Sequence, residues 1–184
     1  AFRSRPFNRV PERGSRPNAL FITCTDSEPL SPDVNVVLKG NEEAFKKGAQ
    51  ALTVFAEKET FLCIPKGSQF PTITGASTHS FSGKHPSGLA GTHINKLYPV
   101  SRKRVVWTIH LQDVIALGHL IATGKLYVDR VIALSGPPVE KPRLLKVRLG
   151  ADVNTICNGE HPDGEYRYIS GSPLSGRTAM GDEY

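Results

Sequence analysis

Long apolar segments, paired cysteines and catalytic motifs are all scarce in this chain of 184 residues. No apolar run approaches the ~20 residues that span a bilayer, so no segment is predicted to cross a membrane. The three cysteines, Cys24, Cys63 and Cys157, are odd in number and far apart. They argue against a disulfide framework and favour a reducing compartment. Cys24 and Cys63 lie in strand-like apolar runs, which predicts buried thiols.

Nucleotide-binding, hydrolytic and zinc-binding fingerprints are also missing. Neither G-x-x-x-x-G-K-[ST] nor G-x-G-x-x-G occurs, and the sequence around Ser172 does not fit G-x-S-x-G. His79, His85 and His93 are spaced by six and eight residues with no cysteine near, which fits no zinc pattern. The residues therefore predict a ligand-binding domain that lacks the groups to run a reaction.

Positive charge is plentiful, with a net charge of +6. Residues 1–17 carry five arginines (Arg3, Arg5, Arg9, Arg13 and Arg16) and a single acid, Glu12. This segment has no helical period and no aromatic ladder, so nucleic-acid binding is only a weak alternative. The pattern is typical of an extended arm laid over a surface, and a chain that opens without Met suggests part of a longer protein.

Strand, helix and strand follow one another after this arm. The continuous apolar run 19–25 is typical of a buried parallel strand. Asn41 precedes a helix whose Phe45, Ala49 and Leu52 fall on one face, and Gly48 within it suggests close packing on a sheet. Residues 61–64 form the next strand, which completes a right-handed βαβ unit.

Further strands are predicted at 77–81 and 105–109, with a helix at 111–123 that ends at Gly124. Apolar residues go most of the way round this helix, so it is expected to be largely buried. A strand at 127–134 follows. Beyond it, residues 143–149 and 166–170 alternate between tight turns, which indicates a separate small β-rich module.

The stretch from His85 to Ile94 contains Gly88 and Gly91 and follows Gly83. Such a loop is either a tight packing corner or a loop that holds a ligand or partner. A phosphate loop should lead into a helix, whereas Tyr98-Pro99 and a basic run follow here. Asp26 and Glu28 lie beyond the carboxyl end of the first strand, where α/β sheets bind ligands. They could bind ribose hydroxyls or a cation, or simply form a solvated turn.

Several motifs, taken together, resemble one family. They are Arg5-Pro6-Phe7-Asn8-Arg9-Val10-Pro11, Ser27-Glu28-Pro29-Leu30, the stretch from His85 to Ile94, Val106-Trp107-Thr108-Ile109, Gln112-Asp113-Val114-Ile115-Ala116 and Lys141-Pro142-Arg143-Leu144. In this order they resemble the A subunits of the bacterial Na⁺-translocating NADH:quinone reductases, of which the chain looks like a middle portion. The resemblance implies an α/β fold, with a Rossmann-like domain at 18–126 after the arm at 1–17 and a β-grasp, SLBB-type module at 127–184.

The same resemblance implies a function and a set of partners. The expected protein is a peripheral subunit on the cytoplasmic face of the bacterial inner membrane. It takes part in the quinone-reducing half of electron transfer coupled to Na⁺ export, with other subunits and ubiquinone as partners. The complex uses NADH, flavins, an iron–sulfur centre and ubiquinone. This stretch is expected to bind no cofactor and not to be catalytic alone. In related flavin-binding proteins, such as the flavin-carrying subunit of respiratory complex I, a glycine-rich flavin loop occupies the position that Arg3 to Arg9 occupy here. The alternative is an autonomous flavin- or nucleotide-binding oxidoreductase domain.

Two groups of site residues follow from these expectations. The first, expected to face quinone or a partner, is His85, Gly88, Gly91, Thr92, His93 and Glu28. The second, expected to dock on other subunits or on anionic headgroups, is Arg3, Arg5, Arg9, Arg102, Lys103 and Arg104. His93 in particular is expected to lie away from a packed core, so that its loss changes stability by no more than ~1 kcal/mol.

Overall fold

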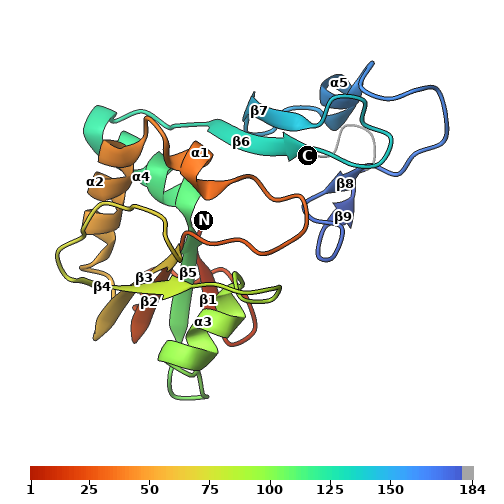
Figure 1. Ribbon diagram of the computed structural model, residues 1–184. Coiled ribbons are helices and arrows are strands. Elements are labelled where there is room, and N and C mark those ends of the chain that lie inside the picture. The colour runs from red at the N-terminus through yellow and green to blue at the C-terminus, as the bar shows by residue number, and fades with distance from the viewer. Residues whose placement is uncertain (180–184) are drawn as a thin grey trace. The chain divides into compact units, whose positions relative to one another are not determined.

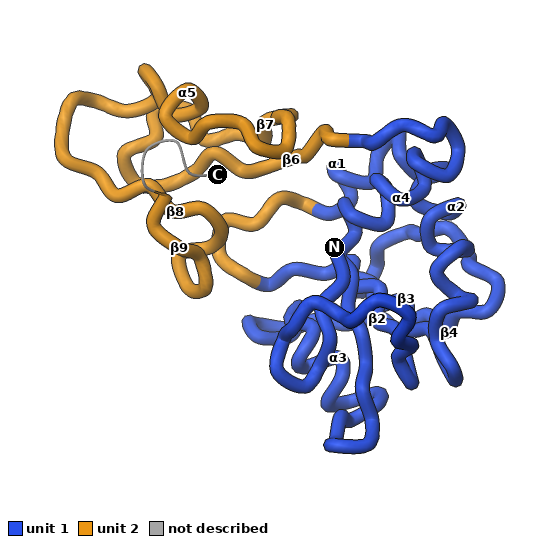
Figure 2. The backbone as a smooth tube through the Cα atoms, turned by 180° about the vertical axis from the view of Figure 1, so that it is seen from behind, with its two compact units in different colours: residues 1–27, 34–127 blue, residues 28–33, 128–184 orange. Residues whose placement is uncertain are grey.

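Two compact units make up residues 1–179, the part of the chain that the computed structural model describes (Figures 1 and 2). Unit 1 contains residues 1–27 and 34–127. Unit 2 contains residues 28–33 and the chain from Val128 onward. The expected arm at 1–17 is therefore part of unit 1, and the segment from Glu28 to Asp33 is grouped with unit 2.

Unit 1 is built on a five-stranded sheet with the order β1-β5-β2-β3-β4 (Figure 1). Its strands are β1 (Arg3–Arg5), β2 (Ala19–Thr23), β3 (Glu59–Pro65), β4 (Ala76–Phe81) and β5 (Val106–His110). Strands β2 to β5 are parallel, and β1 pairs antiparallel with β5. The four parallel strands confirm the predicted α/β class, whereas β1 was not predicted.

Helices cover both faces of this sheet. Unit 1 contains α1 (Val34–Leu38), α2 (Glu42–Leu52), α3 (Ala90–Leu97) and α4 (Leu111–Thr123). Alternate strand residues point to opposite faces. Phe21 and Phe61 pack in one buried cluster with Ile94 of α3, while α2 and α4 lie against each other on the opposite side (Figure 1). The doubly covered sheet explains why every residue of β2 is buried.

Two expectations for α2 and α4 are wrong. A side chain at Gly48 would meet the backbone of Val114 and Gly118, and one at Gly118 would meet the backbone of Ala44. Gly48 thus permits close approach of the two helices rather than packing on the sheet. Helix α4 is also less buried than expected, because Ile121 is 53% exposed. Its C-terminus matches the prediction, with Gly124 in the left-handed conformation.

Unit 2 is a small β-rich module, as predicted. Its elements are β6 (Asp129–Leu134), β7 (Arg143–Arg148), α5 (Val153–Cys157), β8 (Ile169–Ser170) and β9 (Arg177–Thr178). Strands β6 and β7 form one antiparallel ladder, and β8 and β9 form another. The guanidinium of Arg143 binds the carboxylate of Glu160 through two hydrogen bonds of 2.6 and 2.7 Å. The predicted strand at 166–170 is reduced to its last two residues.

Cys24 and Cys63 are buried and unpaired with each other. Burial raises the pKa of the Cys63 thiol to about 12. Burial and the neighbouring Cys63 also raise the pKa of Cys24. Both thiols therefore stay protonated and act as small apolar core groups, which confirms the prediction.

Candidate functional site

The carboxyl ends of three parallel strands meet at one edge of the unit 1 sheet. Because β2, β3 and β4 run in the same direction, the segments that follow them lie side by side. These segments line a pocket of about 400 Å³. Its lining comes from three stretches of sequence: Thr25, Asp26, Ser27, Pro65, Lys66, Phe81, Ser82, Gly83, Lys84, His85, Ser87 and Gly88. Open α/β sheets bind ligands at this edge, and we call this hollow the carboxyl-edge pocket.

The glycine-rich loop after β4 leads directly into helix α3, which begins at Ala90. The expectation that no helix follows the loop is wrong. The side-chain hydroxyl of Thr92 donates a hydrogen bond of 2.8 Å to the carbonyl of Pro86 and so fixes the entry into the helix. The loop therefore has the order strand, loop and helix, although it lacks the nucleotide-binding fingerprints.

Gly88 and Gly91 serve different purposes in this loop. The N–H of Gly88 donates to the hydroxyl of Ser27 at 2.9 Å, and its carbonyl accepts from the hydroxyl of Thr25 at 3.0 Å. A Cβ at Gly88 would overlap the backbone nitrogen of Ser27 and lie 2.7 Å from the carbonyl carbon of Asp26. A Cβ at Gly91 would meet nothing within 4 Å. Gly88 thus supports the packing-corner alternative, and Gly91 is not needed for packing.

His93 is fully buried, with 0% of its surface exposed. Its Nε2 lies 3.0 Å from the carbonyl oxygen of Ser87 and 3.2 Å from the hydroxyl of Thr25. A carbonyl only accepts, so Nε2 carries the proton and Nδ1 is the bare nitrogen. Among residues 1–179, that buried Nδ1 has no hydrogen-bond partner. The expectation that His93 lies away from a packed core is wrong.

The surroundings of His93 keep its ring neutral. Burial lowers its pKa below 6.5, the nearby Lys96 lowers it further, and the hydrogen bond to Ser87 acts in the opposite direction. The ring also packs on Phe81, with 4.0 Å between ring centroids. His93 therefore joins the loop to β2 and β4 as a neutral structural group, and in this conformation it does not reach the carboxyl-edge pocket.

His85 is the histidine that remains accessible in the loop. Its Nδ1 lies 3.2 Å from the carbonyl oxygen of Ser27 and 3.3 Å from the hydroxyl of the same residue. Donation to the carbonyl places the proton on Nδ1, so Nε2 is an acceptor in the neutral ring and a donor in the protonated ring. Of the two predicted histidines, His85 is the one that can exchange a hydrogen bond with a ligand.

Lys66 and Lys84 are pocket residues that the sequence reasoning missed. Both are exposed, and no ion pair joins either of them to an acid in residues 1–179. Each follows a predicted strand, so the rule that ligands bind at the carboxyl edge could have identified them. With His85 and the hydroxyl of Ser27, they give the pocket mostly hydrogen-bond donors, while Asp26 contributes one carboxylate.

Glu28 is not grouped with these residues. It belongs to unit 2, where its carboxylate accepts a hydrogen bond of 2.7 Å from the hydroxyl of Ser175. Of the two acids predicted to lie beyond the first strand at a ligand site, Asp26 lines the carboxyl-edge pocket and Glu28 does not.

All the expected docking cations except Arg3 lie at the opposite edge of the unit 1 sheet. Arg3 and Arg5 are in β1, with Arg5 opposite Val106 at the start of β5. Arg9 returns to pair with Ser4. Arg102, Lys103 and Arg104 lie in the turn that precedes β5. The two turns that carry Arg9 and residues 102–104 thus lie at the edge of the sheet opposite the carboxyl-edge pocket, while Arg3 lies opposite Thr108 in the middle of β5.

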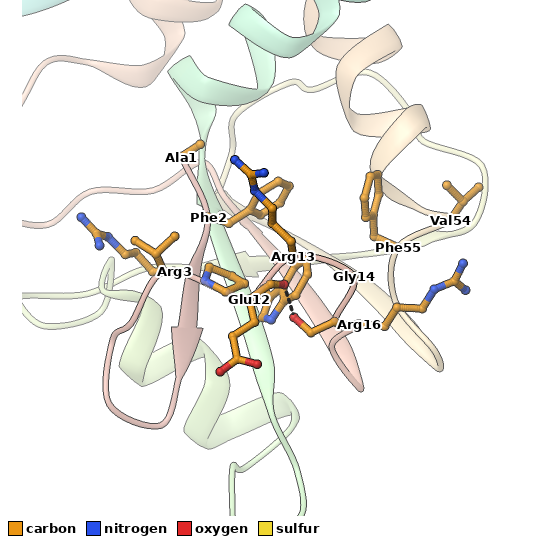
Figure 3. A pocket seen from close by; sticks show the side chains of 13 residues that line it. Ala1, Phe2, Arg3, Glu12, Arg13, Gly14, Arg16, Val54 and Phe55 are labelled. Atoms are coloured by element: carbon orange, nitrogen blue, oxygen red, sulfur yellow. Dashed lines mark hydrogen bonds between the residues drawn. The ribbon is translucent and has the colours of Figure 1, made fainter.

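The first residues of the chain also fold back over the sheet. There they line a second pocket of about 720 Å³ (Figure 3). The ring of Phe2 packs on Trp107 and Phe55, with centroids 5.4 and 6.1 Å apart. Arg3, Glu12, Arg13 and Arg16 line the same pocket, as the close view shows. Residues 1–17 are therefore part of the folded unit and not a separate arm.

The described part of the chain contains neither a cluster of metal ligands nor a helix that could span a membrane. Among residues 1–179, no three His, Cys, Asp or Glu side chains gather as metal ligands. In the same residues, no helix has the length and apolarity to cross a bilayer.

The fold and the pocket define a class: a Rossmann-like α/β domain with a small β-rich module after it. The family described as "NqrA second alpha/beta domain" matches residues 1–126, and "NQRA C-terminal domain" matches residues 131–181. The chain therefore belongs to the NqrA family, the A subunits of the Na⁺-translocating NADH-quinone reductases.

Curated relatives agree with this family. The A subunit of the Na(+)-translocating NADH-quinone reductase from Marinomonas sp. (strain MWYL1) is 48% identical over 98% of this chain. Its counterparts from Pseudomonas aeruginosa and Cellvibrio japonicus are 46% and 43% identical over 98% and 99% of it. The chain spans 41% of the length of each of these relatives.

Proposed function

We propose that the protein containing this chain is a peripheral subunit of a sodium-pumping NADH:ubiquinone oxidoreductase, and that it takes part in the quinone-reducing half of the reaction. The observation that carries this proposal is the match of both family domains to one chain in their order. The partners would be the other subunits of the membrane complex, on its cytoplasmic face.

Within this role, we assign the quinone- or partner-facing surface to the carboxyl-edge pocket. Quinone carbonyl oxygens accept hydrogen bonds, and the pocket offers donors from Lys66, Lys84 and the Ser27 hydroxyl, while the Ser87 hydroxyl donates to the carbonyl of Gly83. His85 adds a group that accepts from a quinol hydroxyl when neutral and donates to a quinone oxygen when protonated. Three other members of the predicted group, Gly88, Thr92 and His93, act by shaping the loop that carries His85.

A flavin does not fit the position that flavin-binding relatives use. A phosphate loop needs flexible backbone with N–H groups directed at the anion. Here the corresponding residues form β1, whose backbone is bonded to β5, and the turn held by Ser4 and Arg9. We therefore propose that this stretch binds no flavin. The purified full-length protein should be colourless and release no flavin on denaturation, whereas a stoichiometric yellow cofactor would support the autonomous flavoprotein alternative.

Quinone kinetics of the intact complex test the assignment of the pocket. We expect His85→Gln and Lys84→Gln to raise the apparent KM for quinone severalfold with a smaller change in kcat, as for lost binding. Lys47→Gln is the matched control, because Lys47 is an exposed lysine on α2, away from the pocket. Equal KM values for the pocket variants and the control would exclude the carboxyl-edge pocket as the quinone-facing surface.

A further inference from the structure

An exposed aromatic side chain stands on a strained turn at the amino edge of the unit 1 sheet. Phe7 is 77% exposed, and both Phe7 and Asn8 have positive φ values, 76° and 50°. Bulky residues rarely adopt this left-handed conformation, and such strain persists only where the surroundings hold it. Here the N–H of Ser4 bonds the carbonyl of Arg9 at 2.7 Å and closes the turn.

Phe7 differs in this respect from Phe2, the other aromatic residue of the same segment. Phe2 packs on Trp107 and Phe55 and supports the sheet. Phe7 has no ring partner among residues 1–179 except the guanidinium of Arg9, 5.6 Å from its centroid. The fold uses one phenylalanine for packing and holds the other outside.

A second turn projects beyond the same end of the sheet. Arg5 lies opposite Val106 in the antiparallel pair of β1 and β5, so the chain after Arg5 and the chain before Val106 leave in the same direction. A bridge between Ser101 and Arg104 closes the second turn. Arg102, Lys103 and Arg104 are all exposed there. We call the two turns, with Arg5, Phe7, Arg9 and residues 102–104, the tip surface.

The tip surface is positive and lacks neutralising acids. Residues 1–11 contain no Asp or Glu, and none occurs between Glu59 and Asp113. In the described residues, no ion pair involves Arg5, Arg9, Arg102, Lys103 or Arg104. The tip surface therefore combines one exposed aromatic ring with five cations, of which Arg5 is half-buried and the other four are exposed.

We propose that the tip surface binds an anionic phospholipid bilayer, with its cations at headgroup phosphates and Phe7 in the interfacial region. A bilayer surface places negative charge directly above apolar chains, and this order matches a surface that carries both exposed cations and an exposed phenylalanine. An acidic protein surface would pair with the cations but would not account for a phenylalanine held outside by strain. This contact does not depend on quinone at the opposite edge.

Vesicle cosedimentation of the full-length protein tests this proposal. The probes are phosphatidylcholine vesicles with and without phosphatidylglycerol. We expect binding only to the anionic vesicles, and weaker binding at high salt. Each cation near such a surface strengthens binding about fivefold, so the pair Arg102→Gln/Lys103→Gln should weaken it about 25-fold. Phe7→Ala should weaken it severalfold at unchanged charge.

The matched control removes the same charge elsewhere. Lys46→Gln/Lys47→Gln takes two exposed lysines from α2, on the face of the sheet opposite α3. It should leave vesicle binding within about twofold of the unmodified protein. Equal losses in the two double variants would show attraction by net charge alone and would overturn the tip surface. Unchanged binding of Phe7→Ala would overturn the insertion of the ring. Failure to bind anionic vesicles, with loss of the other subunits from Arg102→Gln/Lys103→Gln in detergent, would assign the surface to an acidic protein partner.

Discussion

The two edges of the unit 1 sheet use their polar residues in opposite ways. At the carboxyl edge, Thr25, Ser27 and His93 direct their hydrogen-bonding groups to the loop that follows β4. At the amino edge, Arg9 and residues 102–104 direct their charges outward and pair with no acid in residues 1–179. Substitution of these residues should therefore affect stability at the first edge and association at the second. His85 and Lys84, which line the carboxyl-edge pocket, are the exception, because their substitution is expected to change quinone binding.

The largest effect on stability is expected from a substitution of Gly88. In Gly88→Val, the new side chain would overlap the backbone of Ser27 and Asp26, which cannot move aside without breaking the loop. We expect a loss of about 3 kcal/mol in the free energy of unfolding, at the upper end of overpacking costs. Gly91→Ala is the control: it sits in open space at the start of α3 and should gain up to ~1 kcal/mol. Urea denaturation of both variants checks this difference, and equal stabilities would contradict it.

His93→Ala should have the next largest effect on stability. The change leaves a cavity beside Phe81 and removes a bonding partner from Ser87 and Thr25. We expect a loss of about 2 kcal/mol, in place of the ~1 kcal/mol limit that the sequence suggested. His79→Ala, a half-buried position on the edge strand β4, should cost less than half as much. Thermal denaturation of the two variants measures this difference. Equal losses of stability would refute the structural role of His93.

The pH dependence of stability gives a smaller effect with a definite sign. The pKa of His93 is lowered in the folded state, so below pH 6.5 the unfolded chain binds more protons at this residue. The contribution of His93 is thus complete above pH 6.5 and is lost as the pH falls through the lowered folded pKa. In His93→Gln, this step should be missing from a plot of melting temperature against pH. A wild-type-like acid slope in that variant would show that other groups cause it.

The smallest effect on stability is expected at the tip surface. Arg9→Ala and Arg102→Gln/Lys103→Gln remove exposed charges without acidic partners and should change the free energy of unfolding by no more than ~0.5 kcal/mol. The same variants should weaken assembly or membrane association. Arg5→Ala tests this separation of stability from association more sharply. Arg5 is half-buried, and its buried Nε has no hydrogen-bond partner in residues 1–179. A large loss of stability in Arg9→Ala with normal association would assign the turn to the core.

The sequence located β2, β3 and β5 well because each is a short apolar run between polar turns. It missed β1, whose Arg-Ser-Arg sequence has no apolar alternation and is a strand only because β5 supplies its hydrogen bonds. It also missed α3, since glycines and Pro86 in the preceding loop have low helix propensity. The buried state of His93 depends on Thr25 and Ser87 being brought together by the fold, and no local pattern could reveal it.

Hydrogen exchange of the intact complex, with and without a quinone-site inhibitor, tests the central claim most directly. If the carboxyl-edge pocket faces quinone, the inhibitor should slow exchange of backbone amides at 82–89 and leave those at 6–9 and 101–104 unchanged. Transfer of the complex into anionic bilayers should slow exchange at the second set alone. Unchanged exchange at 82–89 on inhibitor binding, or equal responses of the two edges to both treatments, would contradict this division of the sheet.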